Sequence, residues 1–514
     1  MTDKVKRFKD AIFFLIVFSL IFNNIPKSVQ MMFLGGCVGD KLVFYPLVVG
    51  MFYSVYIQIK HKSLFTNKKI IIRFILLYIS MVVGSLVLGL VNYPFYEVLT
   101  NGPINQIDKL TNVLNVLEEC NIKVVEKYIM IAWMILRNLK GLFLEILFTF
   151  GGAYMIYCWY ADDYKRGIKI LCLGVFSSVV VIVFYSVIEI FYLAGNKTAK
   201  DILQYITPFF HFIGQDGYWW PPLLWKGQLR SLFAEPSYFG TYCAFAVPFL
   251  YLLIFNSSSF KRYFYFIFTI VLLFFLVLTK ARTGIVLHMG QLLILISLLI
   301  YLNKEKSKKI VSIVLVSSLF AFCMGNLFIS TFMNQNNVNS QQLHKTINQY
   351  VDNNIASLGR SKARSNHARY SIMLADFKIG LDYPVFGVGN NLRNAYIPQY
   401  LSEEAKNNEE IKMWLSFREK FGILKYGFPR LGEYTVRFAE TGIIGLILFL
   451  SPVLYLLFSL IRGIKKYNEN LSLIFYITAL VGIMANGLGN SLLSSYYYWV
   501  LLGLGYTMID SIEE

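Results

Sequence analysis

Two short stretches of the sequence place charged residues at the edge of long apolar runs. Arg230 and Glu235 lie in GQLRSLFAEPSYFG (227–240), and Lys280 and Arg282 lie in TKARTG (279–284). Arginine suits a diphosphate, because its planar guanidinium donates paired hydrogen bonds and stays charged. These cations therefore predict a site that binds a phosphate attached to a lipid. The alternative is that they only anchor helix ends at the membrane surface.

The composition places the sequence among membrane proteins. Of its 514 residues, 56% are hydrophobic and 15% are charged, whereas about 25% are charged in soluble domains. Hydropathy predicts an all-α polytopic protein that forms a single unit over 1–514, with about twelve transmembrane helices. The predicted spans are 11–26, 42–59, 70–92, 138–160, 169–193, 238–255, 263–279, 284–302, 310–332, 439–461, 471–487 and 490–508.

The charges of the connections predict the topology. Basic residues gather in six segments, at 4–9, 60–69, 165–166, 261–262, 304–309 and 462–466. By the positive-inside rule these segments face the cytoplasm, as do both termini. The net charge of +18 follows from this topology, so no nucleic acid partner is expected. No small-x-small cleavage site follows the first apolar run, so we expect a retained anchor rather than a signal peptide.

Three longer segments are predicted to face outward, at 93–137, 194–237 and 333–438. Loops as long as the last one are usually functional or disordered. Its aromatic and aliphatic content predicts a folded external cap over the active site. The segment is also rich in cations that are candidates for diphosphate binding or for a solvated basic face, namely Lys345, Arg360, Lys362, Arg364, Arg369, Lys378, Arg393, Lys406, Lys412, Arg418, Lys420, Lys425, Arg430 and Arg437.

Four stretches in the second half of the chain resemble the O-antigen polymerase and ligase superfamily of bacterial envelopes, and within it the Wzy-type polysaccharide polymerases. RSLFAEPSYFG (230–240) resembles their Arg and Glu-Pro-Ser signature, and TKARTG is similar to their Ser-x-Ser-Arg turn. SNHARYSIMLADFKIGLDYPVFGVGNN (365–391) resembles an external pattern in which an arginine, here Arg369, precedes a helix and a Pro-x-Phe-Gly-x-Gly turn. RFAETGIIGLILFL (437–450) is similar to their Glu-x-Gly-x-x-Gly start of a span.

This resemblance implies a reaction at the outer face of the bacterial cytoplasmic membrane. Such enzymes transfer a growing glycan from undecaprenyl diphosphate to a sugar hydroxyl of a new lipid-linked repeat unit. The leaving diphosphate gains charge as the bond breaks, so preplaced cations stabilise the transition state more than the ground state. The implied partners are the undecaprenyl-diphosphate-linked oligosaccharide, membrane lipid, and a flippase and chain-length regulator of the same pathway. No metal and no cofactor are expected, because arginine supplies the positive charge.

The resemblance also implies roles for individual residues. Glu235 is the first candidate for the proton acceptor, because partial desolvation at the membrane boundary raises the pKa of a carboxylate. Glu440 is the second candidate, and each of the two is alternatively a structural partner of an arginine. The catalytic candidates are Arg230, Glu235, Arg282 and Arg369, and the substrate-binding candidates are Lys280, His367, Arg437 and Glu440.

One departure from the family pattern favours a polymerase over a ligase. Ligases of this superfamily usually carry a histidine about nine residues before the Glu-x-Gly pair, where this sequence has Leu431. His367 is a candidate to replace that histidine in space. An O-antigen ligase remains the alternative. A transporter of lipid-linked oligosaccharide is an alternative of another class, but transporters usually show repeat symmetry between halves, which this sequence lacks.

Two further acidic residues fall within or near the ends of apolar spans. Glu145 and Glu189 are functional candidates, because ionisable residues are rare inside a membrane. Arg137 and Lys140 are candidate partners of Glu145 or of a lipid phosphate.

Overall fold

The protein is built from helices throughout the part of the chain that the structure describes. The computed structural model describes residues 3–31, 39–61, 69–103, 106–107, 110–120, 125–212, 227–301, 305–333, 364–466, 471–493 and 495–513. The long helices are α1 (Asp3–Ser19), α3 (Phe44–His61), α4 (Lys69–Val91), α7 (Glu126–Ile146), α9 (Tyr164–Leu193), α11 (Pro236–Asn256), α12 (Ser259–Leu278), α13 (Arg282–Tyr301), α14 (Glu305–Phe328), α16 (Arg364–Asp382), α20 (Glu433–Lys466), α21 (Leu471–Asn486) and α22 (Tyr496–Glu513).

Shorter helices connect the long ones. A π-helical turn, η3 (Leu147–Gly151), joins α7 to α8 (Gly152–Tyr160), and a second π-helical turn, η5 (Ile329–Met333), ends α14. The remaining short helices are α5 (Tyr96–Thr100), α6 (Leu110–Glu119), α10 (Lys197–Ile206), η4 (Thr207–Phe209), α17 (Arg393–Tyr400), α18 (Glu403–Lys406) and α19 (Glu409–Phe421).

The prediction of an all-α polytopic membrane protein is confirmed. Each predicted span falls on a helix, and eight helical stretches of the described residues are long and apolar enough to cross a membrane. The count of twelve is not confirmed. The eight stretches are Ile71–Val91, Glu126–Tyr160, Tyr164–Leu193, Pro236–Asn256, Ser259–Leu278, Arg282–Tyr301, Ser307–Met333 and Glu433–Ile464, and α21 is a shorter apolar helix.

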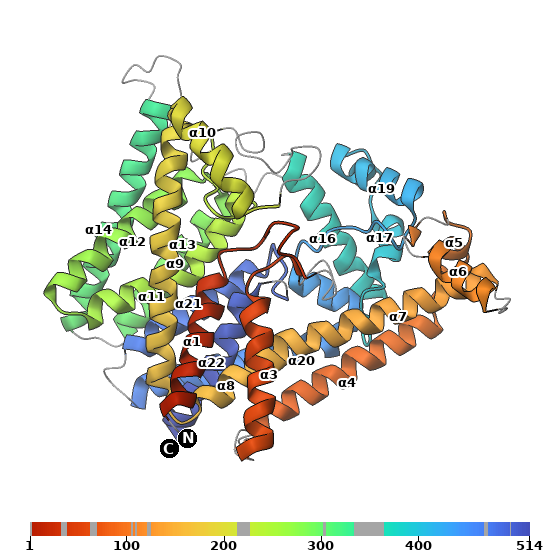
Figure 1. The fold of residues 1–514 in the computed structure, drawn as a ribbon, viewed down its shortest axis with the longest axis horizontal. Coiled ribbons are helices and arrows are strands. Elements are labelled where there is room, and N and C mark those ends of the chain that lie inside the picture. The colour runs from red at the N-terminus through yellow and green to blue at the C-terminus, as the bar shows by residue number, and fades with distance from the viewer. Residues whose placement is uncertain are drawn as a thin grey trace.

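The two ends of the helix bundle differ. Both termini lie at one end, whereas α5, α6, α10, α16, α17 and α19 lie towards the opposite end (Figure 1). The three segments that were predicted to share one side of the membrane therefore contribute helices to the same end of the molecule. The residues 334–363 of the predicted cap lie outside the described part of the chain.

The centre of the bundle is α11. This helix is apolar on all sides, and 83% of its membrane-spanning window is buried, because α9, α12, α13 and α21 pack around it. Gln291 of α13 donates hydrogen bonds to the carbonyls of Ala244 on α11 and Thr478 on α21, at 2.7 and 3.0 Å. Such polar contacts fix the rotation of packed membrane helices, which need not be driven together by the hydrophobic effect. The rigid core thus sets the position of the first residues of α11 and α13.

Candidate functional site

The first residues of α11 and α13 lie side by side at a close helix crossing. A Cβ added at Gly240 of α11 would lie 2.6 Å from the Cα of Gly284 on α13. Gly240 and Gly284 are four and two residues from the starts of their helices, so both N-termini lie within about 6 Å of the crossing along each axis. Unpaired backbone amides and the helix dipoles make such N-termini favourable for anions. The two stretches that carry the sequence-predicted cations therefore meet.

Arg230 is fixed by a buried carboxylate of a third helix. Glu189 of α9 accepts hydrogen bonds from the backbone amides of Arg230 and Ser231, at 2.8 and 2.6 Å. Ser231 has a positive φ of 56°, and the Ser186 hydroxyl donates to its hydroxyl at 2.8 Å. Leu229 donates its amide to the carbonyl of Leu278 at the end of α12. Glu189, a functional candidate from the sequence, thus shapes the turn that holds Arg230.

The turn between α12 and α13 holds the next two cations. Lys280 adopts a positive φ of 52°, and Arg282 begins α13. Burial lowers the pKa of Lys280 below its ordinary value. Glu235 precedes Pro236, the first residue of α11, and accepts a hydrogen bond from the Ser237 hydroxyl at 3.2 Å. Lys280, Arg282 and Glu235, which the sequence analysis placed at this boundary, are all partly exposed.

Arg369 of α16 lies within electrostatic range of the start of α11. Its charge acts on the hydroxyl of Tyr238, in the first turn of α11, as does the charge of Glu235. We call the set Arg230, Lys280, Arg282 and Arg369 the cation cluster. His367, two residues before Arg369 on α16, has its Nε2 3.9 Å from the exposed carboxylate of Glu404 on α18.

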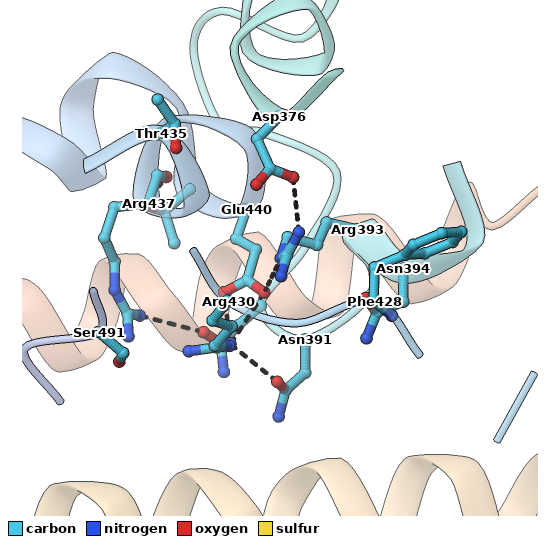
Figure 2. Close-up of polar contacts among 12 residues, drawn as sticks. Asp376, Asn391, Arg393, Asn394, Phe428, Arg430, Thr435, Arg437, Glu440 and Ser491 are labelled. Atoms are coloured by element: carbon cyan, nitrogen blue, oxygen red, sulfur yellow. Dashed lines mark hydrogen bonds and ion pairs between the residues drawn. The ribbon is translucent and has the colours of Figure 1, made fainter. Parts of the chain in front are cut away.

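A second group of charges, most of them buried, lies where α16, α17 and α20 pack together, and Glu145 joins it from α7 (Figure 2). We call it the charge network. Arg437 pairs with Glu433 at 2.7 Å and with Glu145 at 3.4 Å. Arg430 donates to both carboxylate oxygens of Glu440 at 2.9 Å. In addition, Arg393 contacts Glu440 at 3.7 Å and Asp376 at 2.6 Å.

The charge network forms because two glycine-rich turns pair through their backbones. Val388 and Gly389 donate their amides to the carbonyls of Ala439 and Glu440, at 2.9 and 3.0 Å. Ile443 donates to the carbonyl of Pro384 at 2.7 Å. Gly442 takes a φ of 65° that interrupts α20 at this point. The Pro-x-Phe-Gly-x-Gly stretch and the Glu-x-Gly stretch, recognised separately in the sequence, are therefore direct partners.

Helix α4 holds this pair of turns from the other side. The Ser85 hydroxyl lies within hydrogen-bond distance of the carbonyls of Glu440 and Phe386, at 2.6 and 2.8 Å. Gly89 permits α4 to approach the turn, because an added Cβ would lie 2.7 Å from the Cα of Gly389. Sequence analysis did not single out either residue. The available signal was the spacing of two small residues, Ser85 and Gly89, which are four positions apart in an apolar helix.

The electrostatics of the charge network depend on burial and pairing together. Burial raises the pKa of Asp376 to about 6, although Arg393 opposes the shift. Burial acts against the charged form of Arg430, but the carboxylates of Glu440, Glu145 and Glu433 together outweigh it, so the pKa of Arg430 is raised. Sequence analysis did not select Asp376, which lies on the buried face of α16, seven residues after Arg369.

The two substrate-binding candidates within the charge network are enclosed. Arg437 and Glu440 are 0% and 1% exposed, whereas Arg430 and Glu145 have side chains that are 25% and 18% exposed. The roles of Arg437 and Glu440 in substrate binding therefore stay predictions. Arg430 lies beside Leu431, the position where ligases usually carry a histidine, and its guanidinium is engaged with Glu440.

One helix connects the cation cluster to the charge network. Arg369 and Asp376 are both on α16 and two turns apart, which is about 10 Å along the helix axis. That separation is comparable with the length of a short oligosaccharide. The arrangement can hold an anion at the cation cluster while neutral polar groups of the same molecule extend towards Arg430 and Glu145.

Comparison with known proteins gives one match. Residues 266–412 match the family model described as O-antigen ligase, and no curated protein matches the chain. The matched stretch covers α12, α13, α14, α16 and α17, and therefore includes Lys280, Arg282 and Arg369. Arg230, Glu235 and the residues of α20 lie outside it. Members of this family are membrane glycosyltransferase-like enzymes of the ligase and polymerase type.

Proposed function

The chain belongs to the O-antigen polymerase and ligase superfamily, and from this premise we propose that it is a polysaccharide polymerase. It joins oligosaccharide repeat units that are linked to undecaprenyl diphosphate, at the outer face of the bacterial cytoplasmic membrane. The observation that carries the proposal is the crossing of α11 and α13 at Gly240 and Gly284. That crossing brings two helix N-termini together, with Lys280 and Arg282 at the start of α13 and with Arg230, which is 3% exposed, in the segment before α11.

The proposed reaction breaks one bond and forms another. The bond between the anomeric carbon of the growing glycan and the diphosphate oxygen breaks, and its electron pair stays on the lipid diphosphate. A hydroxyl oxygen of the new repeat unit bonds to the anomeric carbon. Its proton passes to Glu235, which is accessible beside the cation cluster, and from there to solvent or to the released diphosphate.

The cation cluster acts on the leaving group. Negative charge grows on the diphosphate as the glycosidic bond breaks, so fixed cations stabilise the transition state more than the bound substrate. Arg282 and Lys280 are held by the tight turn between α12 and α13, and Arg230 is held by Glu189. Because these positions are fixed before the substrate arrives, little reorganisation is needed during the reaction.

An O-antigen ligase is the second candidate, because the matching family model carries that description. The absence of a histidine at Leu431 favours the polymerase. The two functions differ in the acceptor. A polymerase needs only lipid-linked repeat units, whereas a ligase transfers the glycan to a different lipid acceptor.

The test uses purified protein in liposomes with lipid-linked repeat units of its own host and no nucleotide sugar. A ladder of longer glycans is expected from the native protein. Arg282→Ala should slow transfer roughly a hundredfold, by analogy with the loss of one transition-state hydrogen-bond donor. Lys412→Ala, which removes an exposed cation of α19, is the matched control and should leave the ladder unchanged.

Three other outcomes would revise the proposal. Transfer that begins only after a second lipid acceptor is added would identify a ligase. Movement of the lipid-linked unit across the liposome membrane without any transfer would identify a transporter. Equal rates for Arg282→Ala and Lys412→Ala would remove the cation cluster from the mechanism.

A further inference from the structure

Helix α16 has two different apolar faces. Its buried face consists of small and aliphatic side chains, Ala368, Ile372, Ala375 and Ile379, all of them 0% exposed. The opposite face carries larger apolar side chains that are between 37% and 60% exposed, namely Tyr370, Leu374, Phe377 and Leu381. We call this second set the outer stripe. The first face is buried against α20, and of the outer stripe Phe377 also contacts that helix, through the ring of Phe438 at 5.7 Å, yet it stays 45% exposed.

The outer stripe is continuous along the helix. Its members are spaced by four, three and four residues, so they line one side of α16 over about 16 Å. Full burial of one large apolar side chain stabilises a protein by about 1.5–3 kcal/mol relative to leaving it in water. A contiguous row of such side chains that stays exposed therefore marks an interaction surface. The cap therefore presents a face that requires an apolar neighbour.

The outer stripe leads directly onto a lipid-facing surface. Val385 and Phe386, in the turn after α16, are 46% and 45% exposed. The same turn is bonded to α20, since Ile443 donates its amide to the carbonyl of Pro384. From that point Ile443, Ile444 and Ile447 are exposed on α20, a candidate membrane span. One apolar surface thus runs from a membrane helix up along α16.

The flanks of the outer stripe are polar. Lys378 and Asp382 are exposed on one side of it, and Arg369 is partly exposed on the other. An apolar face bordered by charged residues is typical of a helix that lies in the membrane interface. Tyr370 and Tyr383, near the two ends of the stripe, are of the residue type that is enriched at the headgroup level.

We propose that α16 is seated in the outer surface of the bilayer, with the outer stripe in contact with lipid acyl chains. The partner is bilayer lipid and not a second protein, because the stripe is continuous with the exposed apolar face of α20. Low mean hydropathy hides this role in the sequence, since half of the helix is polar or charged. The proposal goes beyond the proposed function and does not depend on it. It places Arg369 at the depth of the lipid headgroups.

Nitroxide labels on α16 test the proposal. The exposed residues Cys120 and Cys323, and Cys37 outside the described residues, are first replaced by serine. Three single-cysteine variants are then labelled, and one copy is placed in each lipid nanodisc. Two of them test the outer stripe, Leu374→Cys and Leu381→Cys, and Lys378→Cys is the matched control on the same helix. Collisions of each label with oxygen, which enters lipid, and with a water-soluble nickel chelate are measured by electron paramagnetic resonance.

The labels at 374 and 381 should favour oxygen over the nickel chelate several-fold more than the label at 378. Their depth should be about 5–10 Å below the headgroups. Nickel accessibility at 374 and 381 equal to that at 378 would place α16 in water and overturn the proposal. Protection of 374 and 381 from both reagents would mean that protein covers the outer stripe, which also overturns it.

A second measurement covers the case in which a labelled variant fails to fold. Leu374→Trp and Lys378→Trp are each compared in vesicles of ordinary and of brominated phosphatidylcholine. Bromine should quench the added fluorescence at 374 several-fold more than at 378. Equal quenching at the two positions would contradict contact with acyl chains. Neither measurement uses enzyme activity, so its failure is distinguishable from failure of the proposed polymerase.

Discussion

Gly240 and Gly284 lie in direct backbone contact where α11 crosses α13. An added Cβ on Gly284 would lie 2.7 Å from the Cα of Gly240 and 2.9 Å from the Cδ1 of Leu276. Neither position has room for a side chain, so the crossing is as close as two helices can come. This contact brings Glu235 and Arg282, which are distant in sequence, to one edge of the bundle.

Gly284→Ala should separate the two helix N-termini. The added methyl meets rigid backbone on α11, and overpacking of this kind costs about 1–3 kcal/mol. We expect a lower melting temperature and weaker binding of the lipid diphosphate substrate. Gly290→Ala is the matched control on the same helix, because nothing lies within 4 Å of a Cβ added there. Equal effects of the two substitutions would mean that the crossing does not position the site.

Glu189→Ala should release the turn that carries Arg230. Two buried backbone amides would lose their acceptor, and each unsatisfied buried donor costs about 1–3 kcal/mol. We expect a lower melting temperature and a lower kcat for transfer, because Arg230 is proposed to act on the leaving group in the transition state. Glu189→Gln should be intermediate because one amide oxygen can still accept. Phe191→Leu, at an exposed position on the same turn of α9, should resemble the native protein. A raised KM at constant kcat would instead assign Arg230 to binding of the substrate in its ground state.

Asp376 should make the stability of the protein depend on pH. Its folded-state pKa of about 6 lies above the ordinary value, so the folded state holds this proton more tightly than the unfolded chain does. The stability that this group contributes is therefore complete at low pH and is lost as the pH rises through about 6. The difference corresponds to about 3 kcal/mol. The charged groups that act on Asp376 are Arg393, Glu440 and Arg430.

Melting temperatures of the native protein and Asp376→Asn, measured from about pH 4 to 7, test this expectation. The native protein should lose stability relative to the variant across that range, since asparagine does not titrate. Asp382→Asn, at an exposed position on the same helix, should follow the native curve. Parallel curves for the native protein and Asp376→Asn would show that Asp376 is ionised throughout.

Glu235→Gln should lower activity, whereas Glu440→Gln should lower the stability of the fold. Glu440 is buried and held by Arg430 and Arg393, so removing its charge leaves Arg430 without its anion and Arg393 with Asp376 alone, and should destabilise the protein by about 3–5 kcal/mol. Glu235 has no arginine within ion-pair distance in the described structure, and its substitution should leave the melting temperature unchanged. We expect the rate of transfer by the folded protein to fall about 10²–10⁴-fold in Glu235→Gln only, since a general base is lost. A fall of that size in folded Glu440→Gln, with none in Glu235→Gln, would exchange the two assignments.

The sequence by itself determined the class of the protein and proposed the residues of the cation cluster. Hydropathy is a sum over neighbouring residues, so apolar runs identify membrane helices without knowledge of their packing. Arg230, Lys280 and Arg282 were recognisable because charge beside an apolar run is a local feature. The resemblance carried by four short stretches identified the family, which the match over 266–412 supports.

Only the tertiary structure decided which charges pair and which remain accessible. Glu189 contacts Arg230, which is 41 positions away in the sequence. Ser85 contacts Glu440, which is 355 positions away. Such contacts depend on how helices pack and leave no periodic pattern in the chain. The sequence therefore proposed Glu440 and Arg437 as substrate ligands without showing that both are enclosed in a charge network. It also did not reveal the outer stripe of α16, because such a stripe becomes visible only when the other face of the helix is seen to be buried.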